Sequence, residues 1–161
     1  MKTRFAAVAV AAAALAGASP AGATPAPATF QHVYPAAAKL CAAVAKGEGP
    51  VKLKPSAASV LADCAALESG FNTANAAKLA ALPPIETALA SARSTTAAAC
   101  PTPHTHAALC LKTRHTEHPV IASLEAQRRS VMKTYRAAVE TGRIAFWKAI
   151  QALPGGANLK P

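Results

Sequence analysis

The residues best suited to chemistry are four histidines gathered in one short stretch, His104, His106, His115 and His118. Imidazole nitrogens bind zinc, copper and haem iron, so a loop that holds several of them together predicts a metal or haem site. The spacing matches no standard zinc signature, because His115 and His118 are three residues apart and not four as in H-E-x-x-H. A solvated connection with His118 capping a helix, and a pH-responsive surface, are the competing interpretations.

The four cysteines form an even set, which is typical of disulfides in an exported chain. Cys41 lies shortly before an expected turn between two helices, and Cys64 lies at a similar distance after it, so the two sulfurs should face each other. Cys100 and Cys110 bracket a proline-rich connection that a second bridge would close. We therefore predict the pairs Cys41–Cys64 and Cys100–Cys110. The absence of a C-x-x-C motif argues against an oxidoreductase.

Other enzymatic machinery is missing from the sequence. It contains no glycine-rich phosphate loop, no G-x-S-x-G elbow and no calcium loop. The carboxylates are scattered and often lie at helical spacing from a basic residue, as Glu125 does from Arg129, which is typical of surface ion pairs. We predict a protein that is not an enzyme, with no catalytic residue and no cofactor; zinc, copper or haem in the histidine loop is the alternative.

The most regular element is the stretch 119–153, in which apolar residues recur at steps of three, four or seven. This periodicity predicts one long amphipathic helix. Pro119 suits its first turn, where a missing N–H is no loss, and Pro154 followed by two glycines would end it.

Basic side chains of this helix fall mostly away from its apolar stripe. Arg128, Arg129 and Lys133 are therefore candidate contacts for a partner. Trp147 is a further candidate, because adjacent helical residues point about 100° apart and Trp147 would face outward if Phe146 faces the core. A core position for Trp147 is the other interpretation.

Three earlier stretches, 30–46, 56–82 and 85–99, also have helical periodicity and are rich in alanine. Pro83-Pro84 separates the last two, because it removes two backbone donors and disfavours helical geometry just before it. A corner there would give four helices, whereas a kink would give one long bent helix packed against 119–153. The length of the last helix favours the kink. The sequence thus predicts an all-α fold: an elongated antiparallel bundle of three to four alanine-rich helices with a kink or corner at Pro83-Pro84.

The N-terminus has the pattern of a secretory signal peptide. Lys2 and Arg4 precede an apolar run, and Ala21-Gly22-Ala23 follows as a cleavage site. We predict a signal peptide at 1–23, a flexible Pro/Ala linker at 24–29, one helical domain at 30–156 and a disordered tail at 157–161. Prolines interrupt the apolar run well short of the ~20 residues of a membrane span, so we expect no transmembrane helix in the mature chain. The expected location is secreted, periplasmic or associated with the cell envelope.

The mature chain is basic. Loss of Lys2 and Arg4 with the signal leaves 15 basic and 7 acidic residues, a net charge of +8. Such a surface attracts anionic polymers, but we expect no nucleic acid, because export removes that ligand and no aromatic-and-basic motif is present. The favoured function is a non-enzymatic, envelope-associated binding or structural protein that contacts anionic cell-envelope polymer or another protein. The alternatives are a histidine-loop metal or haem binding protein and a periplasmic helical holdase.

Overall fold

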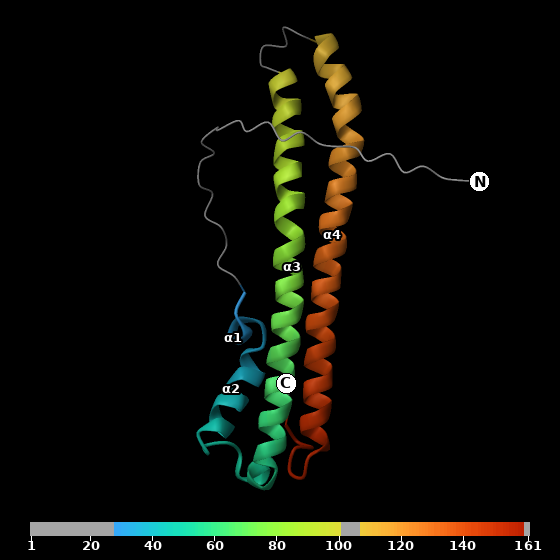
Figure 1. The fold of residues 1–161 in the computed structure, drawn as a ribbon. Coiled ribbons are helices and arrows are strands. Elements are labelled where there is room, and N and C mark those ends of the chain that lie inside the picture. Colours follow the sequence, from blue (N-terminus) through green and yellow to red (C-terminus); the bar gives the residue numbers. More distant parts are fainter. Residues whose placement is uncertain (1–27, 101–106, 160–161) are drawn as a thin grey trace, which may run out of the picture.

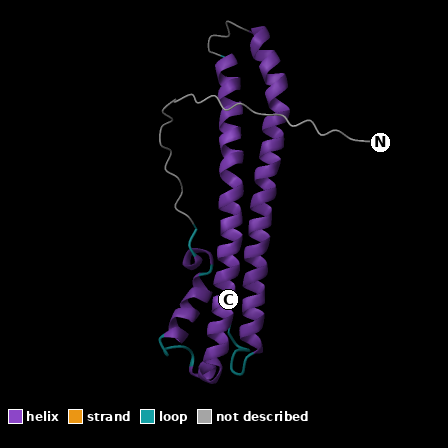
Figure 2. Ribbon diagram, in the orientation of Figure 1, coloured by secondary structure: helices purple, strands orange, loops and turns teal. Residues whose placement is uncertain are grey.

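Two long antiparallel helices dominate the computed structural model, which describes residues 28–100 and 107–159. The elements in chain order are α1 (Phe30–Val33), α2 (Pro35–Ala45), the 3₁₀ helix η1 (Val51–Ser56), α3 (Ala57–Ala99) and α4 (Ala107–Ala152). Figure 1 shows α3 and α4 side by side, with α1, α2 and η1 at one end of the pair. The predicted all-α fold is confirmed, and Figure 2 shows no strand among these residues. The predicted signal peptide and most of the predicted linker lie outside them.

Helix α3 continues without interruption through Pro83-Pro84. The corner is therefore excluded, and the alternative of a single long helix is confirmed. Each proline deprives the carbonyl four residues earlier of its helical donor, here the carbonyls of Leu79 and Ala80. These two residues and both prolines are exposed, so water can bind the freed carbonyls. The alanine-rich helix on either side, packed against α4, holds the chain straight across this point.

Helix α4 begins at Ala107, which corrects the prediction that the last helix starts at Pro119. Pro119 lies inside the helix, and the carbonyl that it leaves without a donor belongs to the exposed His115. The stretch 107–118, expected to be a connection, instead forms about three further turns. The complete helix has 46 residues and is roughly 70 Å long.

The hydrophobic core lies at one end of the molecule, which we call the base (residues 28–71 and 135–159). Its largest fully buried side chains are Leu53 from η1, Val60 from α3 and Ile150 from α4. The remaining members of the buried cluster are Tyr34, Ala37, Val44, Cys64, Leu67, Phe71, Phe146 and Trp147. Only in the base do α1 and α2 add a third layer to the α3–α4 pair.

Trp147 belongs to this core. It is only 8% exposed, and its ring lies edge-on to Phe146 with the centroids 5.2 Å apart. The core interpretation of Trp147 is confirmed, and its assignment as a contact for a partner is wrong.

The segment that follows α4, as far as Leu159, packs back on the base. Gly155 has a positive φ of 82°, and a side chain there would collide with the carbonyl of Lys52, so the predicted glycine stop after α4 is confirmed. Gln151 donates a hydrogen bond of 3.0 Å to the carbonyl of Leu159, and Leu159 packs against the core. The ordered chain therefore extends beyond the predicted boundary at residue 156.

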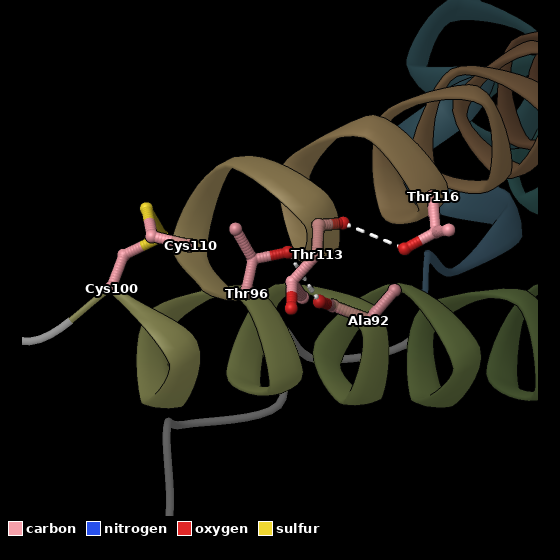
Figure 3. Close-up of a disulfide and its surroundings, with 6 residues drawn as sticks. All are labelled: Ala92, Thr96, Cys100, Cys110, Thr113 and Thr116. Atoms are coloured by element: carbon pink, nitrogen blue, oxygen red, sulfur yellow. Dashed lines mark hydrogen bonds between the residues drawn. A yellow bond between two sulfur atoms is a disulfide. The ribbon is translucent and has the colours of Figure 1, made fainter. Parts of the chain in front are cut away.

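The remainder of α3 and α4, residues 72–100 and 107–134, forms what we call the arm. Leu89 and Ala92 are the buried residues in the described part of the arm. Full burial of a large apolar side chain contributes about 1.5–3 kcal/mol, so the arm gains much less from its core than the base does. It projects from the base as a two-helix hairpin, closed at its far end by a disulfide (Figures 1 and 3).

Candidate functional site

Both predicted disulfides are present. Cys41–Cys64 joins α2 to α3 with the Cα atoms 5.9 Å apart, and Cys100–Cys110 joins the end of α3 to the first turn of α4 with the Cα atoms 4.8 Å apart. Figure 3 shows the second bridge, between the end of α3 and the first turn of α4 at the far end of the arm. This bridge holds the start of α4 against α3 in a region where few apolar side chains are buried. No free cysteine remains among the described residues, so no thiol is available there as a metal ligand.

The histidine stretch is only partly described. His104 and His106 lie outside the described residues, whereas His115 and His118 are exposed on α4, three residues apart and therefore neighbours on one helix face. The described parts of the chain contain no group of three or more His, Cys, Asp or Glu side chains arranged to hold a metal ion. Binding of zinc, copper or haem by the four histidines stays a prediction.

An open depression of about 730 Å³ lies along the distal end of α4. His115 and His118 line it, next to Leu111 and Arg114 of α4 and Thr96 of α3. Figure 3 shows Thr96 near the disulfide, where its hydroxyl donates a hydrogen bond of 3.0 Å to the carbonyl of Ala92. The depression combines apolar and basic side chains and contains no carboxylate among its described lining residues.

Acidic residues are few near the distal end of the arm in sequence. No Asp or Glu occurs between Glu86 and Glu117, a stretch that contains Arg93, Lys112 and Arg114. Arg93 pairs with Glu125 of α4, whereas Lys112 and Arg114 make no ion pair with another described residue.

Two of the predicted partner contacts are engaged in ion pairs. Arg128 lies 3.5 Å from Glu86 of α3, and Arg129 lies 3.8 Å from Glu125 on its own helix. Glu125 also accepts a hydrogen bond of 2.9 Å from Arg93 of α3. All of these side chains are well exposed, so each pair contributes at most about 1 kcal/mol. Two of these pairs, Arg93–Glu125 and Arg128–Glu86, link α3 to α4 across the middle of the arm, where large buried side chains are few.

The exposed cations of α4 are distributed unevenly around the helix. Steps of four, eleven, four and three residues connect the members of one side, which we call the basic flank: Arg114, His118, Arg129, Lys133 and Arg136. The opposite side carries the exposed Lys112 and Lys148 and otherwise mostly uncharged residues at similar spacing: Ser123, Gln127, Ser130, Thr134 and Ala138. The predicted contact Lys133 lies on the basic flank and is exposed.

Burial and ion pairing shift the pKa of four side chains in the base. Burial raises the pKa of the Tyr34 hydroxyl, and the nearby Tyr135 and Glu140 raise it further. Burial also raises the pKa of Tyr135. Hydrogen bonds of 2.9 and 2.7 Å from Arg143 lower the pKa of Glu140, and the same contacts raise the pKa of Arg143. These groups are two phenols packed in or against the core and one surface ion pair.

Sequence reasoning missed Leu109, Leu111 and Arg114, which lie in the part of α4 that was expected to be a connection. The acid-free stretch that surrounds them was a usable signal, because it marks the end of the molecule with uncompensated positive charge. Their exposure was not predictable without the location of the third layer.

Comparison with known proteins adds no functional information. No protein-family model, curated protein or solved structure matches this chain. None of the described helices is both long enough and apolar enough to span a bilayer.

Proposed function

We propose that this protein is a non-enzymatic, exported binding protein that contacts anionic cell-envelope polymer through the basic flank of α4. The observation that carries the proposal is the row of five exposed basic residues along one side of that helix. A linear polyanion can lie along one side of a straight helix and meet several of these charges at once. The base then holds the C-terminal part of α4 in place while the rest of the helix projects from it.

Three cations of the basic flank are free to meet an anionic ligand. Arg114, Lys133 and Arg136 make no ion pair with another described residue, whereas Arg129 is close to Glu125. Arg114 and Arg136 are separated by roughly 33 Å along the helix. That span fits a polymer with repeated charges better than a small anion.

The two disulfides support an extracytoplasmic location. Disulfides persist in oxidising compartments and are rare in the reducing cytosol. They agree with the signal-peptide pattern of residues 1–23 and with a protein that meets envelope polymer after export.

The proposal is tested by salt-dependent binding of the mature chain to immobilised long-chain polyphosphate and to isolated cell envelopes. The test variant carries Arg114→Glu, Lys133→Glu and Arg136→Glu. The matched control carries Lys39→Glu, Lys46→Glu and Lys54→Glu, three exposed lysines of the base. Both variants change the net charge equally, so overall charge cannot explain a difference between them.

We expect the α4 variant to bind at least about ten-fold more weakly and the control to lose less than about three-fold. Neutralised phosphates release counterions, so the slope of log affinity against log salt should also fall by about 2 in the α4 variant. Equal losses in the two variants would show that binding follows net charge alone and would remove the proposal.

A further inference from the structure

The distal end of the arm exposes large apolar side chains. Leu109 is 54% exposed, Leu111 is 68% exposed and Val120 is 47% exposed, all within the first four turns of α4. No third layer covers this part of the α3–α4 pair in the described structure. These side chains therefore remain in contact with water unless a partner covers them.

Basic residues are interleaved with these apolar side chains. Lys112 follows Leu111, and Arg114 lies beside Leu111 in the distal depression. A long Lys or Arg side chain can hold its charge at the level of lipid phosphates while its stem and a neighbouring leucine enter the boundary between headgroups and acyl chains.

We propose that the distal end of the arm, residues 107–121, docks on the surface of a bilayer that contains anionic phospholipid. The inference rests on the proposed function, because it names one envelope component that the cationic α4 would meet. It adds a second contact, since the exposed leucines contribute nothing against a hydrated polyanion but contribute binding at a lipid surface.

Charge complementarity favours an anionic lipid surface over a second copy of the chain. The arm contains seven basic residues and three acidic residues between positions 72 and 134, so two arms repel each other. An anionic membrane attracts the same charges, and each Lys or Arg close to the surface strengthens binding about five-fold. Glu117 is the one acidic residue in the sequence from 107 to 121, against Lys112 and Arg114, so this segment keeps a net positive charge.

Flotation of the mature chain with vesicles tests the inference at an ionic strength of about 0.15 M. One set of vesicles contains phosphatidylcholine alone, and the other contains about one-third phosphatidylglycerol. The test variant is Leu109→Ser with Leu111→Ser. The matched control is Val51→Ser with Ile144→Ser, because these base residues are 76% and 55% exposed.

We expect binding to the phosphatidylglycerol vesicles only, a loss of about ten-fold in the Leu109→Ser, Leu111→Ser variant and little loss in the control. A separate Leu111→Trp variant should show a blue shift in fluorescence with anionic vesicles, which reports insertion without removing an apolar residue. Unchanged flotation of the double serine variant, or no shift in the tryptophan variant, would overturn the inference.

Binding to polyphosphate separates this inference from the proposed function. A protein that binds polyphosphate but no vesicles contradicts lipid docking and leaves the proposed function intact. A protein that binds neither ligand contradicts both. Equal binding to phosphatidylcholine and phosphatidylglycerol vesicles would also overturn the inference, because it would exclude the charge complementarity on which the inference depends.

Discussion

The hydroxyl of Tyr34 donates a hydrogen bond of 2.8 Å to the backbone carbonyl of Val139, 105 residues later in the chain. Tyr34 lies at the junction of α1 and α2, and Val139 lies in α4, so this bond fixes the third layer of the base to the helix farthest from it in sequence. The Tyr34 ring also packs against Phe30 and Phe71, with centroid distances of 5.5 and 5.9 Å. The base is thus held by side chains from three segments of the chain.

Tyr34→Phe should destabilise the protein by about 1 kcal/mol, because it removes this hydrogen bond and leaves the ring packing in place. Tyr135→Phe is the matched control, since the buried Tyr135 hydroxyl has no hydrogen-bond partner in the described structure. Its removal should be neutral or slightly stabilising. Urea denaturation of both variants measures the difference, and an equal loss for the two would contradict the assigned bond.

The two tyrosines should ionise at a higher pH in the folded protein than in the unfolded protein. Tyr34 and Tyr135 are the only two tyrosines in the sequence, and burial raises the pKa of both above the ordinary value near 10. A pKa raised on folding contributes stability below the unfolded value and loses it as pH rises through the folded value. We therefore expect stability to fall above about pH 10. Absorbance of tyrosinate should rise at higher pH in buffer than in denaturant; coincident curves would rule out buried hydroxyls.

Loss of each disulfide should destabilise a different part of the molecule. Their separations of 23 and 10 residues predict stabilisation of about 3 kcal/mol each, slightly more for Cys41–Cys64. Replacing Cys100 and Cys110 by serine should speed amide hydrogen exchange at the distal ends of α3 and α4 while the base stays protected. Replacing Cys41 and Cys64 by serine should speed exchange in α2. Identical exchange patterns for the two variants would contradict the division into base and arm.

Trp147 should behave as a core residue. It is the only tryptophan in the sequence, so its fluorescence reports on the base alone. We expect a blue-shifted emission and weak quenching by iodide or acrylamide in the native state, with both features lost on unfolding. Strong quenching in the native state would instead indicate that Trp147 faces solvent, the orientation that the sequence also allowed.

Most of the helical fold could be predicted from spacing alone. The periodic apolar residues located the helices, and the position of Cys41 and Cys64 on either side of one turn identified their pairing. Gly47 has the positive φ of 74° that the end of α2 required. These features depend on residues that are close together in the chain, so they can be predicted from the sequence.

The predicted helix ends at prolines were wrong because the effect of proline was judged for an isolated helix, without a second helix packed against it. Pro84 and Pro119 were expected to break or begin helices, yet both lie inside long ones. The carbonyls that they leave without donors are exposed, and packing between α3 and α4 holds the backbone on each side. The exposed leucines of the candidate site escaped notice for a related reason: periodicity shows which face is apolar but not which part of that face a third helix covers.

Hydrogen–deuterium exchange of the mature chain with and without long-chain polyphosphate tests the central claim most directly. The arm has few buried residues, so its amides should exchange fast enough for a bound ligand to slow them measurably. We predict that protection appears in peptides from residues 107–136 and not in peptides from residues 35–56. Protection confined to α2 and η1, or no protection anywhere at saturating polyphosphate, would contradict binding through the basic flank of α4.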